Sequence, residues 1–128
     1  MKSYLWILLI ITSVIVLSCY VISSEKESAS VEYVYDGDTF FINASKGDDK
    51  FRLARIDAPE LDGSERLEGL KSRGALKRLI QGKEIQHVNK GRGYYGRIIA
   101  EVYVNDTTNV SDWLVRNGYA VYKNYSNG

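Results

Sequence analysis

Three short segments carry carboxylate and guanidinium side chains at spacings that could do chemistry on a phosphodiester. They are Asp36-Gly37-Asp38-Thr39, the stretch FRLARIDAPE at residues 51–60, and Tyr94-Tyr95-Gly96-Arg97. A hard cation such as Ca²⁺ takes carboxylate and carbonyl oxygens as ligands, and Asp38 and Asp57 would provide two of them. Such a site requires neither histidine nor cysteine.

Two arginines and one glutamate complete the set that a phosphodiester hydrolase needs. Negative charge builds up on the phosphoryl oxygens when water attacks, so fixed positive groups should surround them. The guanidinium fork donates two hydrogen bonds to neighbouring phosphate oxygens, which favours Arg52 and Arg97 over any nearby lysine. Glu60 is the candidate general base that polarises the attacking water.

Each segment alone is weak evidence. Asp-Gly-Asp is a common turn, Arg52 could be an exposed strand residue, and residues 91–96 lack the Gly-Lys-Ser/Thr ending of a phosphate-binding P-loop. An EF-hand is excluded because Phe41 and Gly47 stand where such a loop needs glycine and glutamate. The prediction therefore depends on the three segments together.

The order and spacing of the segments resemble the staphylococcal nuclease family. The family pattern is Asp-Gly-Asp-Thr, then an arginine eight positions before the glutamate of an Asp-Thr/Ala-Pro-Glu segment, then Tyr-Gly-Arg. Here Arg52 precedes Glu60 by eight residues and Tyr95-Gly96-Arg97 follows, while VSDWLVRNGYA at residues 110–120 resembles the family's second helix and its exit. The resemblance covers about residues 34–125.

The resemblance implies a Ca²⁺-dependent nuclease that cleaves both DNA and RNA with little sequence preference and leaves 3′-phosphate ends. Asp38 and Asp57 would bind the ion, together with the backbone carbonyl of Ala58. The catalytic residues would be Arg52, Arg97 and Glu60, of which the arginines hold the phosphate and the glutamate acts through a water. The aromatic residues expected to contact substrate are Tyr95, at a phosphate or sugar, and Tyr122 or Tyr125, stacked on a base.

This sequence departs from the family in two places. Tyr94 stands where some members carry a lysine, which removes one phosphate contact. The chain ends at Gly128, where relatives continue into a third helix, so we expect a member without that helix. The alternatives are a nuclease-like module that binds nucleic acid with weak or no catalysis, and a sugar-binding module on a cell surface.

The elements that must position these residues indicate an α+β fold. The sequence predicts an OB-type five-stranded β-barrel with one helix inserted after the third strand and one short C-terminal helix. Predicted strands lie at 32–35, 39–43, 50–56, 84–88 and 97–104, and predicted helices at 64–80 and 110–117.

Individual residues support these elements. The expected apolar stripe of the first helix consists of Leu67, Leu70, Ala75, Leu76, Leu79 and Ile80. Asn109 is the expected N-cap of the second helix. His87 and Trp113 are predicted to be structural rather than functional.

The N-terminus is predicted to direct export or membrane anchoring. Lys2 precedes an apolar run of roughly 19 residues, which leaves open a cleaved signal peptide and a retained anchor. Cys19, the only cysteine, ends a lipobox-like Val16-Leu17-Ser18-Cys19, so a lipoprotein is a third possibility. We expect residues 1–23 to be this signal or anchor, 24–30 a linker, and 31–128 an extracytoplasmic nuclease-like domain.

Charge distribution is consistent with a polyanionic partner. Beyond the first 24 residues, basic and acidic side chains number 16 each, yet residues 64–97 hold nine basic and three acidic ones. Such a local excess can gather polyanions without a globally basic protein. We expect DNA and RNA as substrates, the membrane as a partner through the N-terminal segment, no protein partner, and a monomer.

Overall fold

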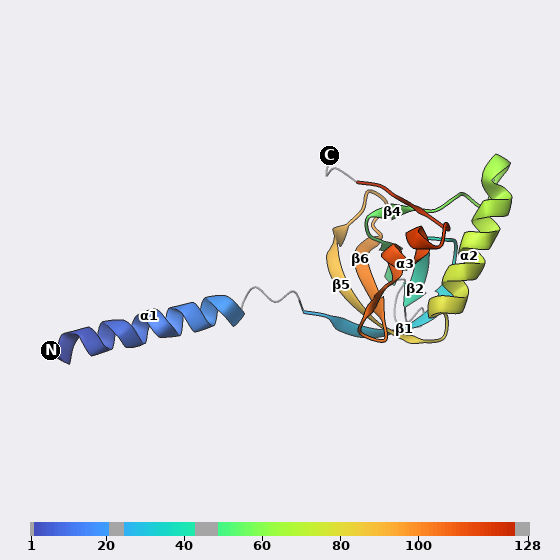
Figure 1. Cartoon of the computed structure of the whole chain (residues 1–128). Coiled ribbons are helices and arrows are strands. Elements are labelled where there is room, and N and C mark those ends of the chain that lie inside the picture. The colour runs from blue at the N-terminus through green and yellow to red at the C-terminus, as the bar shows by residue number, and fades with distance from the viewer. Residues whose placement is uncertain (1, 21–24, 43–48, 125–128) are drawn as a thin grey trace.

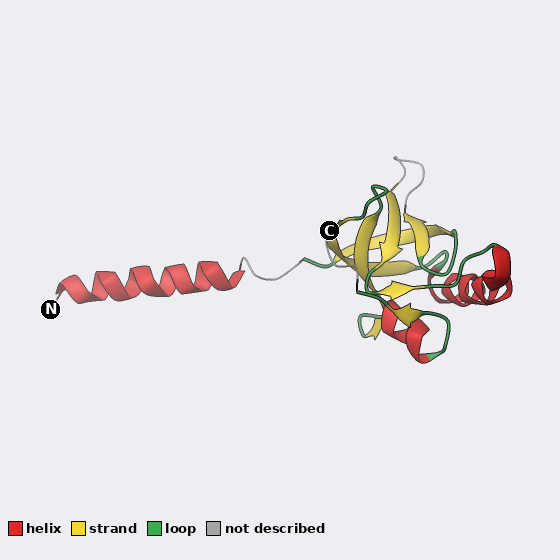
Figure 2. Cartoon of the chain, turned by 90° about the horizontal axis from the view of Figure 1, so that it is seen from above, coloured by secondary structure: helices red, strands yellow, loops and turns green. Residues whose placement is uncertain are grey.

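In the computed structural model, the described residues are 2–20, 25–42 and 49–124. Their helices are α1 (Lys2–Tyr20), α2 (Arg66–Ile80) and α3 (Val110–Arg116), with a 3₁₀ turn, η2 (Gly63–Glu65), ahead of α2. Their strands are β1 (Glu27–Val34), β2 (Thr39–Ile42), β3 (Asp49–Leu53), β4 (Ile56–Asp57), β5 (Glu84–Arg92), β6 (Ile98–Val104), β7 (Thr108–Asn109) and β8 (Val121–Tyr122). Figures 1 and 2 show these strands gathered at one end of the molecule, with α2 and α3 outside them.

A closed barrel forms because the sheet returns on itself. The strands pair in the order β3-β2-β1-β5-β6-β7, and β3 also pairs with β6. The pairing of β3 with β6 is parallel and aligns Phe51 with Ile98 and Leu53 with Ala100. The predicted α+β fold with an OB-type five-stranded barrel is therefore confirmed, and β7 adds a short edge to β6.

The barrel interior follows the two-residue alternation of its strands. Phe40 and Phe51 are paired across β2 and β3, and their buried rings stack with centroids 5.5 Å apart. Ala75, Leu76 and Ile80 of α2 join this core. The predicted stripe of α2 is wrong at Leu67 and Leu70, which are 61% and 44% exposed. The first turns of α2 project past the barrel (Figure 1), and these two leucines lie on the exposed face of the helix.

The predicted strand at 50–56 is in fact two strands separated by a turn. β3 ends at Leu53, and Arg55 adopts a left-handed backbone with φ of 66°. Its guanidinium group bonds the carboxylates of Glu101 and Asp112, the latter at 3.0 Å. The chain then turns into β4, which pairs with β8 through Ile56 and Tyr122. The sequence predicted neither β8 nor the break.

The expected linker at 24–30 is wrong over its second half. β1 begins at Glu27, and residues 27–30 pair with β5, where Glu27 lies opposite His87 and Ser30 opposite Glu84. β5 itself runs to Arg92, beyond the predicted end at residue 88. A polar sequence can still form a strand at a barrel surface, because backbone hydrogen bonds to a neighbouring strand hold it.

Two predictions about local structure are confirmed around α3. The side chain of Asn109 accepts a hydrogen bond of 3.1 Å from the backbone N–H of Asp112, as an N-cap does. Trp113 is partly buried against the core and stacks on Tyr119 at 6.0 Å. On β5, away from α3, His87 was also predicted to be structural, and it is buried with its ring 5.0 Å from that of Phe51.

Helix α1 stands apart from the barrel (Figures 1 and 2). Its large apolar side chains between Tyr4 and Ile15 are 49% to 71% exposed. Within the described residues, no helix combines the length and the apolar character that crossing a membrane requires. The export or anchoring role of residues 1–23, and that of Cys19 within it, stay predictions.

Candidate active site

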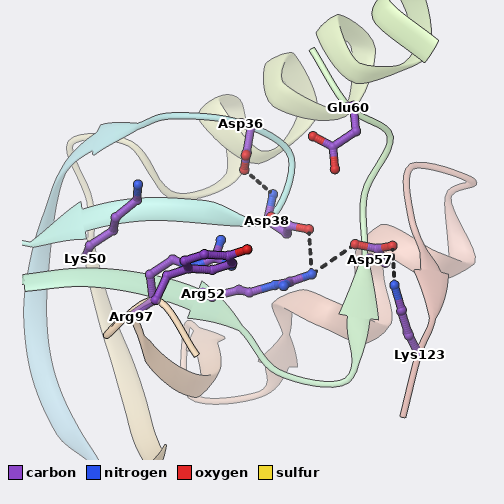
Figure 3. Close-up of a pocket in the computed structure, with 9 residues that line it drawn as sticks. Asp36, Asp38, Lys50, Arg52, Asp57, Glu60, Arg97 and Lys123 are labelled. Carbon is purple, nitrogen blue, oxygen red and sulfur yellow. Dashed lines mark hydrogen bonds and ion pairs between the residues drawn. The ribbon is translucent and has the colours of Figure 1, made fainter. Parts of the chain in front are cut away.

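One pocket of about 590 Å³ receives side chains from all three predicted segments (Figure 3). Among the described residues its lining consists of four acids, four bases and one tyrosine: Asp36, Asp38, Asp57, Glu60, Lys50, Arg52, Arg97, Lys123 and Tyr95. Acidic and basic side chains are therefore equally represented in the lining of this pocket.

The turn between β1 and β2 delivers Asp38 to the pocket. The backbone N–H of Asp38 donates to Asp36 Oδ1 at 3.0 Å, which closes the turn through a side chain. Only glycine can stand between them, because a Cβ on Gly37 would lie 2.6 Å from Cβ of Ala58 and 2.7 Å from Cβ of Ser72. The missing side chain thus lets the turn press against the segment that follows β4 and against α2.

Asp38 is buried and surrounded by hydrogen-bond donors. Its carboxylate accepts from the Thr39 hydroxyl at 3.1 Å and from the Ala58 N–H at 3.0 Å. Burial and the negative charge of Asp36 together raise the pKa of Asp38 to about 6, against the opposing effects of the Ala58 N–H and the Arg52 guanidinium. A cation beside this carboxylate would favour its charged form.

Arg52 joins the two aspartates on neighbouring elements. Its Nη2 lies 2.9 Å from Asp57 Oδ1 and 3.5 Å from Asp38 Oδ2 (Figure 3). Because both oxygens contact the same nitrogen, they lie no farther apart than the sum of these distances. The Arg52 side chain is only 14% exposed, so its guanidinium is held in place before any substrate arrives.

Glu60 lies at the exposed side of the pocket, with its carboxylate turned toward the aspartates (Figure 3). Its backbone is fixed by close packing on α2, since a Cβ on Gly69 would overlap the carbonyl oxygen of Glu60. The Glu60 N–H also donates to Glu65 Oε2 at 3.1 Å. The side chain is therefore free to face solvent while its backbone is anchored.

Barrel closure brings Arg97 to the same pocket, because β6 starts directly after it and pairs with β3. Arg97 Nη1 donates to the Thr39 hydroxyl at 3.3 Å, and its Cζ lies 5.9 Å from the ring centroid of Tyr95. Tyr95 itself is 80% exposed, in the loop that precedes β6.

Comparison with known proteins agrees with this geometry. The sequence model described as staphylococcal nuclease homologue matches residues 50–128. The chain belongs to the staphylococcal nuclease family. A relative from Escherichia coli named "Uncharacterized endonuclease" is 38% identical over 94 residues, which cover 73% of this chain and 60% of the relative. A relative of the same name from Haemophilus influenzae is 37% identical over 107 residues, which cover 81% of this chain and 57% of the relative. The chain thus spans about 60% of the length of these relatives.

The donor chemistry of this staphylococcal-nuclease pocket suits Ca²⁺. Asp38 and Asp57 present hard oxygen atoms on either side of one nitrogen, and Ca²⁺ accepts carboxylates, carbonyls and water in flexible geometry. Among the described residues, no three His, Cys, Asp or Glu side chains are already grouped around one ion position. Water and backbone oxygens would complete the shell. The contact that Ala58 shows here is through its N–H, so the ligand role of its carbonyl stays a prediction.

Of the two tyrosines predicted to stack on a base, only Tyr122 lies within the described residues, and it contacts residues outside the pocket lining. The Tyr122 hydroxyl donates to Asp112 Oδ1 at 2.8 Å, and the Cζ of Arg55 lies 5.9 Å from its ring. Tyr122 is not among the residues that line the pocket. Tyr125 lies outside the described residues. The nuclease-like pocket therefore offers Tyr95 as its aromatic lining.

Sequence reasoning missed two lysines of the site. Lys123 Nζ lies 3.1 Å from Asp57 Oδ2, although 66 residues separate them in sequence. The Lys123 backbone N–H donates to the Arg55 carbonyl at 2.8 Å, which continues the pairing of β4 with β8. Lys50 enters from β3. The only signal for Lys50 was its place in a strand two residues before Arg52, and β8 is too short to show any periodicity.

Proposed function

We propose that this chain is a Ca²⁺-dependent nuclease that hydrolyses phosphodiester bonds of DNA and RNA with little sequence preference. The observation that carries the proposal is the convergence of Arg52, Arg97 and Glu60 on one pocket with two aspartates. The names of the relatives, which are endonucleases, support the same class of reaction.

The two arginines and the glutamate have different roles in the proposed reaction. Arg52 and Arg97 donate hydrogen bonds to the phosphoryl oxygens, where negative charge grows as water attacks. Glu60 accepts a proton from that water as its oxygen bonds to phosphorus. The bond from phosphorus to the 5′ oxygen breaks, and that oxygen takes up a proton from solvent, which leaves a 3′-phosphate on one product and a 5′-hydroxyl on the other.

Asp38 and Asp57 are the residues that would hold Ca²⁺. Such an ion would supply positive charge that stabilises the developing negative charge of the reaction. Tyr95, exposed beside Arg97, would contact a neighbouring phosphate or sugar. The Arg52 guanidinium is paired with both of these aspartates, so it lies beside the oxygens that would hold the ion.

We also propose that residues 1–23 take the domain out of the cytoplasm. The exposed apolar side chains of α1 support a segment that leaves water for a lipid environment or a translocation channel. A cleaved signal, a retained anchor and lipidation at Cys19 make different products. The mass and the membrane partitioning of the expressed chain, with Cys19→Ala as the control for lipidation, distinguish them.

The decisive experiment follows cleavage of denatured DNA by the full chain. We expect degradation with Ca²⁺, no degradation with EDTA, and a loss of about 10² to 10⁴ in kcat for Glu60→Gln. Glu84→Gln, an exposed acid on β5 that does not line the pocket, is the matched control and should retain full activity. Equal rates with chelator, or after Glu60→Gln, would exclude the proposed metal or base. Release of inorganic phosphate from the product 3′ ends by a phosphatase checks the chemistry of cleavage.

A further inference from the structure

A row of side chains crosses the outer surface of three neighbouring strands. Tyr33 of β1 lies opposite Phe41 of β2, and Phe41 lies opposite Lys50 of β3. These three side chains point outward, because the adjacent Phe40 and Phe51 point into the core. The rings of Tyr33 and Phe41 are 6.2 Å apart, and Lys50 Nζ lies 5.6 Å from the Phe41 centroid. We call these three residues the aromatic row.

The aromatic row is continuous with the active-site pocket at one end and has a cation at each end. Lys50 lines the pocket, and Figure 3 shows it across the cluster from Asp57 and Lys123. At the other end, Arg73 of α2 donates to the Tyr33 hydroxyl at 3.0 Å and lies over its ring at 6.0 Å. The row therefore leads from the pocket to the basic helix α2.

Exposure distinguishes this surface from ordinary packing between strands. Tyr33 is 41% exposed, and the neighbouring Tyr35, whose ring lies 5.1 Å from Lys50 Nζ, is 49% exposed. Outward aromatic rings with cations beside them are the combination that binds single-stranded nucleic acid, since each base stacks on a ring and each phosphate meets a positive charge.

The length of the row suits a short piece of substrate. Neighbouring strands lie about 4.8 Å apart, so three strands span about 10 Å. The two rings, 6.2 Å apart, could each receive one base of an unpaired strand, so the row would hold about two nucleotides whose bases are not stacked on one another. A duplex keeps its bases stacked on one another and has none to offer to the rings.

We propose that the aromatic row is an extended substrate-binding strip that holds the unpaired nucleotides next to the scissile phosphate. The bases stack on Phe41 and Tyr33, and the phosphates approach Lys50 and Arg73. The strip gives the enzyme a preference for single-stranded substrates longer than a dinucleotide. This inference rests on the proposed function, because it takes the pocket to be the place where the phosphodiester binds.

The test measures binding of fluorescein-labelled oligothymidylate to the full chain in EDTA, so that no cleavage occurs. Probes are an oligomer of about twelve nucleotides, a dinucleotide, and a duplex of the long oligomer. Variants are Tyr33→Ala and Phe41→Thr, the latter replacing the ring with a β-branched residue that strands also favour. Tyr103→Ala is the matched control, since Lys26 Nζ lies 4.3 Å from the Tyr103 ring and that tyrosine does not line the pocket.

We expect both row variants to bind the long oligomer about tenfold more weakly, which corresponds to one lost stacking interaction. Dinucleotide and duplex binding should not change, and Tyr103→Ala should match the unaltered chain with all probes. Equal affinity of the row variants and the unaltered chain for the long oligomer would overturn the strip. So would equal weakening for the dinucleotide, because the effect would then lie in the pocket.

Two further readouts separate this inference from the proposed function. If the unaltered chain binds the long oligomer through the row but does not cleave it with Ca²⁺, the strip stands and the nuclease proposal fails. If it cleaves normally and the row variants keep their affinity, the nuclease proposal stands and the strip fails. Thermal unfolding identifies a variant that does not fold, and Arg73→Gln, a change at the end of the row away from the pocket, then replaces it.

Discussion

The two sides of the pocket differ in how firmly the fold holds them. On one side, Asp38 and Arg52 are buried or nearly so, come from barrel strands or the turn between them, and bond to one another and to Thr39. On the other side, Glu60 and Tyr95 are exposed and come from connecting segments, as does the partly buried Arg97, which precedes β6. We therefore expect changes on the inner side to lower both stability and activity, and side-chain changes on the outer side to lower activity at little cost in stability.

The two arginines provide the sharpest test of this difference, with the largest expected effect. Arg52→Ala and Arg97→Ala should each lower kcat/KM by about 10² to 10³, because each removes a donor to the phosphoryl oxygens. Only Arg52→Ala should also lower the free energy of unfolding, by about 1 to 3 kcal/mol, because it leaves two carboxylates together without their partner. Steady-state kinetics and urea unfolding measure the two quantities. Equal destabilisation by both changes would contradict the distinction between the inner and outer sides.

Two glycines of α2 test how the outer side is anchored. Gly69→Ala should destabilise the domain by about 1 to 3 kcal/mol and reduce kcat, because the new methyl group would displace the Glu60 backbone. Gly74→Ala in the same helix meets only the flexible end of Arg78 and should stabilise it by up to about 1 kcal/mol. Thermal unfolding and kcat follow both variants. An unchanged kcat in Gly69→Ala would show that α2 does not position the glutamate.

Replacing Lys123 tests whether this lysine changes the affinity of the proposed site for Ca²⁺. The Lys123 ammonium group pairs with the Asp57 carboxylate, which also pairs with Arg52, and the lysine side chain is half exposed. Lys123→Gln should therefore tighten Ca²⁺ binding, by no more than about fivefold for a pair as exposed as this one. Isothermal titration calorimetry measures the affinity, with Lys83→Gln as a control that lies outside the pocket. Weaker binding in Lys123→Gln would mean that the lysine supports the site instead of competing for it.

The smallest expected effect is on the pH dependence of stability, through His87, a buried residue of β5. Burial lowers the pKa of His87, and the carboxylate of Glu27, 3.9 Å away, opposes the change. Below about pH 6.5 the histidine is protonated in the unfolded chain but stays neutral in the folded chain. The free energy of unfolding therefore falls as the pH drops through that value. Between pH 7.5 and 5.5 the loss is at most about 1.4 kcal/mol for each pH unit. Urea unfolding of His87→Gln should show a flatter pH dependence, and an identical slope would contradict this account.

Much of the site could be predicted because its residues lie close together in sequence. The Asp-Gly-Asp turn and the spacing from Arg52 to Glu60 are local patterns, and the structure places them in one pocket. Asn109 was predicted as an N-cap for the same reason, since the contact spans three residues. Periodicity also predicted the helices and most barrel strands, because the inner and outer faces of a strand alternate every two residues.

The remaining features depend on contacts between distant segments. Arg55 continues an apolar alternation, yet its partners Glu101 and Asp112 pull the backbone into a turn. Leu67 and Leu70 match a helical stripe, but the barrel does not reach them. Residues 27–30 have the polar composition of a linker, but they form a strand because they pair with β5.

By itself, the sequence determined which chemical groups the protein has and which local elements carry them. It specified two aspartates, two arginines and a glutamate with the spacing of a nuclease, on strands and turns that local patterns identify. Only the tertiary structure decided that Lys123 meets Asp57 and that Tyr33, Phe41 and Lys50 form one row. The physical reason is that closing the barrel and pairing β4 with β8 join residues that no local pattern connects.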